Sequence, residues 1–358
     1  MRVAIVGGGL TSFAAYLTLR RGGINADEIR VFSTERDPAA AWRRRAIAIR
    51  QTHMRSESDG HCLPASFPGL AVRDSWRRRS PAPLLASFCD RYHPTVDLFL
   101  DHVAELRHAA GWDERVVTTR VARIEPVDGG FALDTHGVFE HVLLATGHPG
   151  LAFPEELRDD PRAVHAYESH EYAETVCVVG AGLAAATEWR NALAAGSRVI
   201  SVRRREPVRR PLNVPRPYLS RRGLASFHGL DANERTALLA DLLVPSYPPG
   251  RDWDEPLHSP RFSVEHRVNG ADQVICATGF RRGYEHDALL AALVEEHGPA
   301  TVDGRLVLDA DSTVPALTDA GRTLAVAGAA GQWAYPAADT LMGARYAAHT
   351  FLRRCRTR

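Results

Sequence analysis

The sequence has few cysteines, no long apolar run and almost no net charge, and each absence argues against a class of protein. Its five cysteines form no C-x-x-C pair and no metal-ligand spacing with the histidines, so neither a redox-active dithiol nor a metal site is expected. With 44 basic and 43 acidic residues, the formal net charge of +1 does not indicate nucleic acid or an anionic membrane as a partner.

Targeting and membrane-spanning signals are also absent. No apolar stretch approaches the roughly 20 residues of a spanning helix. Residues 1–7 run straight into a strand and a glycine turn, without the apolar stretch and small-residue cleavage site of a secretory signal. The expectation is a cytoplasmic protein.

What the chain does contain is a strand–turn–helix pattern that occurs twice. Its 358 residues, 45% of them hydrophobic, are enough for two domain cores. A short apolar strand at 3–6 runs into the glycine turn 7–12 and then into a helical stretch. The same order recurs at 176–179 and 180–185. Each copy predicts a strand, a tight turn and a helix, followed by another β-rich run.

The parallel continues toward the end of each half. A turn signal at 128–130 and another at 269–270 each lie between β-rich runs. Each half then closes with an apolar strand that ends in Ala-Thr-Gly, at 145–147 and at 277–279. We therefore predict an α/β fold of two Rossmann-like dinucleotide-binding domains, with parallel sheets and β-meander crossovers.

The tail most simply completes the first domain. Helical segments are expected at 284–297 and 339–353, and strands at 305–308 and 324–327. The second domain is then inserted in the first. The predicted division is 1–172 plus 276–358 for the first domain and 173–275 for the second, which has a helix at 232–243 between Pro- and Arg-rich loops.

The glycine turns suit a dinucleotide pyrophosphate. Free N–H groups and the dipole at a helix N-terminus stabilise negative charge. The first glycine makes the turn, the second lets the phosphate approach, and the third small residue lets the helix pack on the strand. The residues in these roles are Gly7, Gly9 and Ser12 in the first turn, and Gly180, Gly182 and Ala185 in the second.

The end of the next strand discriminates between nucleotides. A carboxylate there binds a ribose hydroxyl, whereas arginine accommodates a 2′-phosphate. In the second unit this position holds Arg203, Arg204 and Arg205, which favours NADPH over NADH; a solvated surface run is the alternative. In the first unit Ser33 occupies it and Glu35 follows two residues later.

These features resemble the flavin-containing and N-hydroxylating monooxygenases, which hold FAD in the first unit and NADPH in the second. Trp42, after three alanines, matches a tryptophan beside the flavin. Residues 54–56, leading to 62–64, resemble the segment that passes over the isoalloxazine. Thr95 and His165 also match family positions.

The resemblance implies an FAD- and NADPH-dependent monooxygenase. NADPH reduces the flavin, which reacts with O₂ to a C4a-(hydro)peroxide, and one oxygen atom passes to a nitrogen or sulfur of a small metabolite. It also implies contacts of these residues with flavin, cofactor or substrate: Gln51, His53, Arg55 and Ser56 as catalytic residues; Ala145, Thr146, Gly147 and Gly328 beside the cofactors; and His148, Trp333 and Tyr335 near flavin or substrate.

Two alternatives stay open. One is an NAD(P)H-dependent flavin reductase or dehydrogenase that inserts no oxygen. The other is an NADP(H)-binding sensor or partner-binding protein with a degenerate FAD site, which Ser33 motivates together with the absence of the Gly-Asp pair that many flavoproteins carry before the last helix. Partners beyond a small-molecule substrate and O₂ are not indicated, and a homo-oligomer is neither indicated nor excluded.

Overall fold

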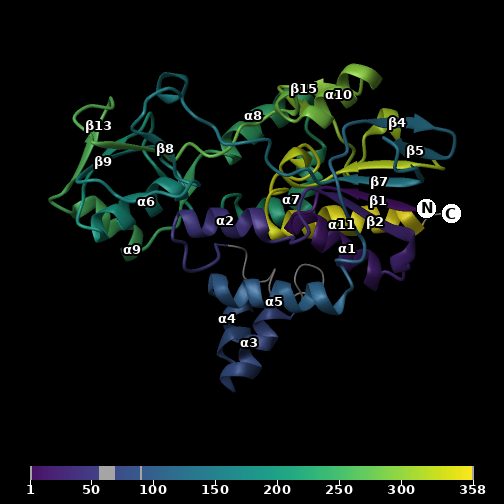
Figure 1. The fold of residues 1–358 in the computed structure, drawn as a ribbon, viewed down its shortest axis with the longest axis horizontal. Helices are drawn as coiled ribbons and strands as arrows, with labels where there is room; N and C mark the ends of the chain where they lie inside the picture. Colours follow the sequence, from purple (N-terminus) through teal and green to yellow (C-terminus); the bar gives the residue numbers. More distant parts are fainter. Residues whose placement is uncertain (1, 56–68, 89–90, 357–358) are drawn as a thin grey trace.

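Two parallel five-stranded sheets form the centres of the two units. The computed structural model describes residues 2–55, 69–88 and 91–356. Figure 1 shows the sheets side by side, one around β1 and the other around β9. Their central strands are short apolar runs buried on both faces, as a parallel sheet covered by helices requires.

The first sheet has the order β17-β7-β1-β2-β3. Along β1, Val3 and Ile5 face the layer of α1, α5 (Val96–Ala109) and α11 (Leu341–Arg356). Ala4 and Val6 face the layer of the β-meander and α10 (Ala288–His297). The elements of this unit before the linker are β1 (Val3–Val6), α1 (Leu10–Arg21), β2 (Ile29–Ser33), α2 (Ala40–Ala48), β3 (Val116–Thr118), β4 (Ile124–Val127), β5 (Gly130–Leu133), β6 (Val138–Phe139) and β7 (His141–Leu144).

The tail completes this sheet. β17 pairs in parallel with β7, and α11 packs along α1, so the chain returns to the first unit after passing through the second. The insertion predicted from the sequence is therefore confirmed, as is the two-unit α/β fold. The elements of the tail are α10 (Ala288–His297), β15 (Thr301–Val302), β16 (Arg305–Leu306), β17 (Thr323–Val326) and α11 (Leu341–Arg356).

The second sheet has the order β13-β10-β9-β14-β8. Trp189 of α6 is fully buried against one face, with Val176 and Val178. The elements are β8 (Ala163–His165), β9 (Thr175–Val179), α6 (Leu183–Ala194), β10 (Arg198–Val202), β11 (Val208–Arg209), α7 (Arg221–His228), α8 (Ala232–Leu242), β12 (Ser246–Tyr247), α9 (Arg251–Asp254), β13 (Phe262–Glu265) and β14 (Gln273–Cys276).

The two turn signals have different outcomes. Residues 128–130 join β4 to β5 in an antiparallel meander, as predicted. The second signal does not make a hairpin, because β13 and β14 are parallel and separated by β10 and β9. A turn-forming Asn-Gly pair permits a reversal, but the sheet order is set by the βαβ packing around it. The division at 172 and 275 stays a prediction, and β8 already pairs in the second sheet.

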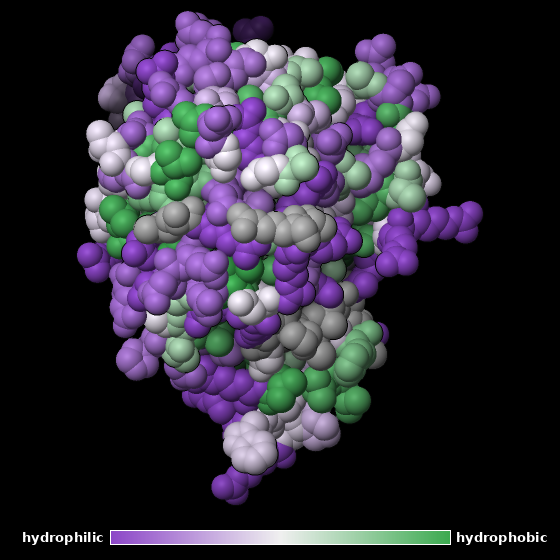
Figure 2. Space-filling view, turned by 90° about the vertical axis from the view of Figure 1, so that its right-hand side faces the viewer, coloured by the Kyte–Doolittle hydropathy of each residue, from purple (hydrophilic) through white to green (hydrophobic). Residues whose placement is uncertain are grey.

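A helical projection extends from the first unit. It contains α3 (Leu70–Arg78), α4 (Ala82–Phe88) and α5 (Val96–Ala109), at the bottom of Figure 1. Figure 2 shows hydrophobic side chains gathered at this end of the molecule. Trp76 is 86% exposed and Phe88 73% exposed. Among the described residues, no helix is both long and apolar enough to cross a membrane.

The linkers between the units pair with each other. The amide of Ala152 donates to the Gly279 carbonyl at 3.0 Å, and that of Arg281 donates to Gly150 at 3.0 Å. At a second contact, the Asn191 side chain of α6 donates to the Ile49 carbonyl at 2.9 Å, at the end of α2. The units are therefore joined by backbone pairing and by a side-chain cap.

Arg55 makes a third contact between the units. Its guanidinium donates to Asn213 Oδ1 at 2.9 Å and to the carbonyls of Ser246 and Arg210 at 3.0 and 2.8 Å. Burial lowers the pKa of this guanidinium to about 10. Arg55 thus fastens two loops of the second unit to the first unit without a carboxylate among these partners.

Replacing Arg55 should loosen this attachment. Arg55→Met removes three hydrogen bonds and leaves two part-buried carbonyls without this donor, a cost of about 2–4 kcal/mol. We expect a lower melting temperature and at least several-fold faster limited proteolysis between residues 206 and 250. His53→Ala is the control, because the His53 side chain is exposed and, within the part of the chain that the structure describes, hydrogen-bonds only with Thr52. Equal cleavage of Arg55→Met and wild type would contradict the proposed fastening.

Candidate functional site

The first glycine turn is shaped by the end of a neighbouring strand. Gly7 has a φ of +109°, which residues other than glycine rarely adopt. A Cβ on Gly7 would lie 2.1 Å from the carbonyl oxygen of Ala145, the first residue after β7. Glycine is therefore required here for the fold itself, because β1 and β7 are adjacent strands.

Gly9 has a different environment. It is the N-cap of α1, and no side chain caps the helix there. A Cβ built on Gly9 would have no described atom within 4 Å. The first-turn N–H groups of α1 therefore have no side-chain acceptor among the described residues, and there is space beside them for an anion. Ser12 is fully buried in the first turn of α1, as the third small residue should be.

The second turn repeats this construction. Gly180 has a φ of +141°, and its Cβ would lie 2.5 Å from the carbonyl of Ala277. Gly182 is the uncapped N-cap of α6, and Ala185 is fully buried. One difference is that a Cβ on Gly182 would come within 3.3 Å of Pro245. The approach to the second turn is thus narrower than the approach to the first.

The Ser33 hydroxyl hydrogen-bonds with the backbone of Glu35. It donates to the Glu35 carbonyl at 2.7 Å and accepts the Glu35 amide at 3.1 Å. The Glu35 carboxylate takes two bonds from Arg44, at 2.6 and 3.0 Å. These bonds lower the pKa of Glu35. Glu35 is therefore held ionised beside the end of β2, with further lone pairs for a ribose hydroxyl, whereas Ser33 closes the turn.

The three arginines after β10 are not equivalent. The Arg203 guanidinium lies 6.0 Å from the Trp189 ring centroid and pairs with Glu206 at 3.1 Å. Its side chain is only 10% exposed. Arg204 and Arg205 are exposed. The position expected to meet a 2′-phosphate therefore offers two accessible cations and a third that packs on α6.

The segment around Gln51 is fixed to the start of α5. Thr52 accepts the Val96 amide at 3.0 Å through its carbonyl, and the Met54 amide donates to Pro94 at 2.9 Å. Gln51 donates to the His53 carbonyl at 2.7 Å. Gln51 and His53 thus share one ordered turn, while Arg55 is engaged with the second unit. Ser56 lies outside the described residues.

The remaining predicted cofactor residues of the first unit lie in α2 and after the ends of β7 and β17. Trp42 of α2 is half-buried and meets Phe99 edge-on, with ring centroids 5.4 Å apart. Thr146 and Gly147 follow Ala145 at the end of β7. A Cβ on Gly328 would lie 3.7 Å from Thr11 in the first turn of α1. The structure therefore brings Gly328, Ala145 and the first glycine turn together.

An aromatic stack joins the two Ala-Thr-Gly ends. His148 and Phe280, the residues that follow the two motifs, stack with centroids 4.0 Å apart. Tyr167 stacks on Phe280 at 5.0 Å, and the Arg45 guanidinium lies 4.6 Å from the Phe280 centroid. The equivalent positions of His148 and Phe280 in the repeat were visible in the sequence, but the contributions of Tyr167 and Arg45 were not.

Two histidines near this junction are held neutral. Burial lowers the pKa of His148 to about 4, assisted by the charges of Arg45 and Arg282. Burial also lowers the pKa of His165 to about 4, against the opposing charge of Glu168. Neither imidazole carries a charge at neutral pH, so both serve as stacking and packing groups there.

A buried carboxylate on α6 was not anticipated. Glu188 is fully buried and accepts from the Tyr172 hydroxyl at 2.8 Å and from His170 Nε2 at 3.1 Å. Burial opposes protonation of His170, but Glu188 outweighs it and raises the pKa. The Arg50 guanidinium lies 4.4 Å from the Tyr172 centroid. This cluster lies where α2 meets the second unit, and a single Glu within an apolar helix gave no signal of it.

Comparisons with solved structures give matches along the whole chain. One match is the ornithine N-hydroxylase of Kutzneria sp. 744, in a structure with reduced FAD, NADP⁺ and L-ornithine. The two are 16% identical, the match covers 98% of this chain and 99% of that chain, and the TM-score is 0.72. Against L-lysine 6-monooxygenase of Pseudomonas syringae, identity is 16%, coverage 99% of both chains, and the TM-score 0.70. The bacillithiol disulfide reductase of Bacillus cereus follows with 13% identity, coverage of 99% and 98%, and a TM-score of 0.59.

At the level of sequence, no protein-family model and no curated protein matches the chain. The likeness is therefore one of fold. The chain shares the two-unit fold of these three proteins, and the fold predicted from the resemblance is confirmed.

Gly7 and Gly9 should respond differently to the same substitution. Gly7→Ala puts a methyl group on the Ala145 carbonyl and should destabilise the fold by several kcal/mol, on the order of 3. Gly9→Ala meets no described atom and should leave the melting temperature nearly unchanged, while its methyl group obstructs an incoming phosphate. We expect at least tenfold weaker FAD binding for Gly9→Ala. Unchanged FAD affinity would exclude this turn as the pyrophosphate site.

The neutral histidines predict a loss of stability in acid. Between pH 6.5 and 4 the unfolded chain binds protons that folded His148 and His165 do not, so unfolding becomes easier as pH falls. His148→Phe keeps a stacking ring and should reduce the loss between pH 7.5 and 5 by up to about 2 kcal/mol. Urea unfolding at both pH values measures it, with exposed His258→Phe as control. An identical pH dependence in His148→Phe and wild type would be the contrary result.

Proposed function

We propose that this chain is an FAD- and NADPH-dependent monooxygenase that transfers one oxygen atom of O₂ to a nitrogen or sulfur of a small metabolite. The observation that carries the proposal is the duplicated turn. Two uncapped helix N-termini follow glycines set against the ends of neighbouring strands, in a fold shared with flavin-dependent hydroxylases.

FAD binding is assigned to the first turn. The open space at Gly9 and the free N–H groups of α1 suit the pyrophosphate, and the Glu35 carboxylate suits the ribose. Gly328 lies beside the first turn of α1, and Trp42 of α2 packs on Phe99. Bound FAD would accept a hydride and activate O₂, which is chemistry the side chains do not supply.

NADPH binding is assigned to the second turn. α6 offers the pyrophosphate an uncapped N-terminus at Gly182. The exposed Arg204 and Arg205 suit a 2′-phosphate, whereas Arg203 supports them from its packing on Trp189. Pro245 and Ser246 bound the approach, and the second of these is held in place by Arg55.

The chain's own residues would position and shield the reacting groups. The paired linkers and the stack of His148, Phe280 and Tyr167 fix the two cofactor edges relative to each other. Neutral His148 adds no charge at this junction. The turn with Gln51 and His53, anchored to α5, presents polar groups beside the expected flavin. The roles of Gln51, His53 and Ser56 toward substrate are part of this proposal.

A second candidate is a reductase that uses NAD(P)H without inserting oxygen. The likeness to the bacillithiol disulfide reductase supports it, because that protein has the same fold over nearly its whole length. The two candidates differ in the fate of O₂. A binding protein without functional flavin is the third reading, and it requires that the Gly9 site take up no FAD.

Visible spectra separate these candidates. We expect an oxidised-flavin spectrum after addition of FAD, bleaching with NADPH in the absence of air, and recovery as oxygen is admitted. With an amine or thioether substrate, an N- or S-oxygenated product should form for each NADPH consumed. NADPH oxidation that never yields an oxygenated product across such substrates would favour the reductase. Protein that takes up no FAD would refute the monooxygenase.

The cofactor preference tests the second turn. Arg204→Gln with Arg205→Gln should raise the dissociation constant of NADPH at least tenfold and change that of NADH little, because only NADPH carries the 2′-phosphate. Fluorescence titration of both nucleotides measures this. Arg198→Gln, an exposed arginine at the opposite end of β10, is the control. Equal weakening of both nucleotides would exclude a phosphate clamp.

A further inference from the structure

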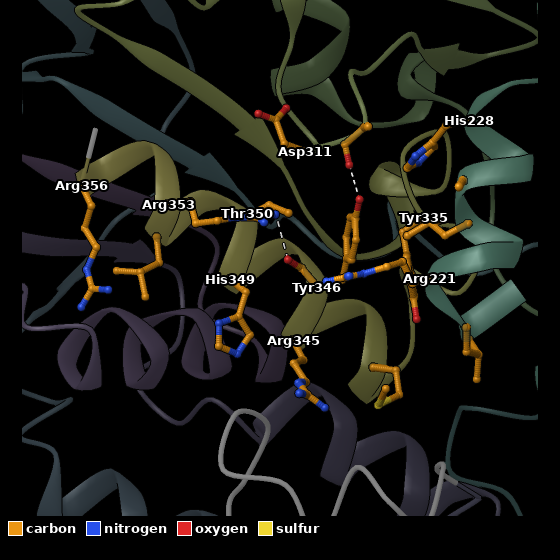
Figure 3. Close-up of a pocket in the computed structure, with 16 residues that line it drawn as sticks. Arg221, His228, Asp311, Tyr335, Arg345, Tyr346, His349, Thr350, Arg353 and Arg356 are labelled. Carbon is orange, nitrogen blue, oxygen red and sulfur yellow. Dashed lines mark hydrogen bonds between the residues drawn. The ribbon is translucent and has the colours of Figure 1, made fainter. Parts of the chain in front are cut away.

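A groove separate from the glycine turns lies between the two units. Its walls are the 3-10 helix η4 (Arg216–Leu219) and α7 of the second unit and the outer face of α11 of the first, and its volume is about 820 Å³. Figure 3 shows α11 along its length with Arg221 at one end and Arg356 at the other. A cavity of this size accommodates a molecule larger than a single amino acid.

The groove combines apolar surface with positive charge. Tyr335 and Tyr346 stack with centroids 4.6 Å apart and form part of its floor, beside Leu224 and Met342. Four arginines line it, together with one carboxylate, that of Asp311. Asp311 is already occupied, because it accepts from Arg354 Nε at 2.6 Å and from Thr313 at 2.6 Å. Asp311 therefore does not pair with Arg221 or Arg345.

Three basic side chains form one stripe of α11. Arg345, His349 and Arg353 follow each other at intervals of four residues, so they lie on one side of the helix. Figure 3 shows Arg345 and His349 beside Tyr346. Burial, Arg345 and Arg353 together lower the pKa of His349. At neutral pH the positive charge of the stripe therefore lies on Arg345 and Arg353, with a neutral imidazole between them.

Helix capping does not explain two of the arginines. Cations near a helix C-terminus are favourable, which accounts for Arg353 and Arg356; Arg356 also donates to the Gly22 carbonyl at 3.0 Å. Arg221 is the first residue of α7 and Arg345 lies in the second turn of α11, toward the positive ends of their helices. Among the described residues, neither has a hydrogen bond or ion pair.

We propose that the groove between α7 and α11 binds an amphipathic anion. Its apolar body lies over Tyr335, Tyr346 and Leu224, and its acid group lies between Arg221 and Arg345. The ligand class is an elongated carboxylate or other acid of comparable charge. The site uses neither glycine turn, so it is independent of the proposed flavin chemistry.

Calorimetric titration with decanoate tests the proposal on the full-length protein, with and without added FAD. We expect a dissociation constant below about 1 mM and at least tenfold weaker binding of decan-1-ol, which has the same chain without the charge. Displacement of 8-anilinonaphthalene-1-sulfonate provides a second readout. Decanoate binding that is undetectable in both assays, or equal binding of the alcohol, would overturn the proposal.

Variants locate the site. The double variant Arg221→Gln with Arg345→Gln should weaken decanoate binding at least tenfold. Arg221→Gln alone should also weaken decanoate binding, and it should not affect folding because Arg221 is exposed. Arg222→Gln is the matched control, as a neighbouring exposed arginine that does not line the groove. Unchanged affinity in the double variant, or an equal loss in Arg222→Gln, would overturn the assignment. Because FAD binding is measured separately, failure here is distinct from failure of the monooxygenase proposal.

Discussion

The close approach of a glycine to a backbone carbonyl of a neighbouring strand determines much of this structure. In each unit the first glycine of the turn lies so close to the end of a neighbouring strand that a Cβ would meet a carbonyl oxygen, at 2.1 Å from Ala145 and 2.5 Å from Ala277. This approach requires the positive φ of Gly7 and Gly180. It also directs the following helix so that its uncapped N-terminus opens at the carboxyl edge of the sheet, where a phosphate is best stabilised.

Much of this arrangement was readable in the sequence. The spacing of glycines after apolar strands predicted both turns, the repeated Ala-Thr-Gly predicted their neighbours, and the order of the two units predicted the insertion. Sheet order was harder to predict: the signal at 269–270 indicated a turn between two β-rich runs, and the strands formed there, β13 and β14, are parallel with two others between them. Local turn chemistry does not contain that information.

The contacts between units were the least predictable part. Arg55 matched a segment expected over the flavin, but its guanidinium is engaged by Asn213 and two carbonyls more than 150 residues away in sequence. Tyr167 and Arg45 complete a stack around Phe280 that no periodic pattern in the sequence predicts. Such contacts depend on how two completed domains meet, which residue spacing alone does not encode.

The return of the chain to its first sheet has a consequence for synthesis on the ribosome. β17 and α11, which finish the first unit, are made only after all of the second unit. The inner unit can therefore fold while the outer one still lacks an edge strand and the helix that covers α1. During that interval the apolar face of α1 and the free edge of β7 are exposed to the translation machinery, and chaperones would have to shield them until the last helix emerges.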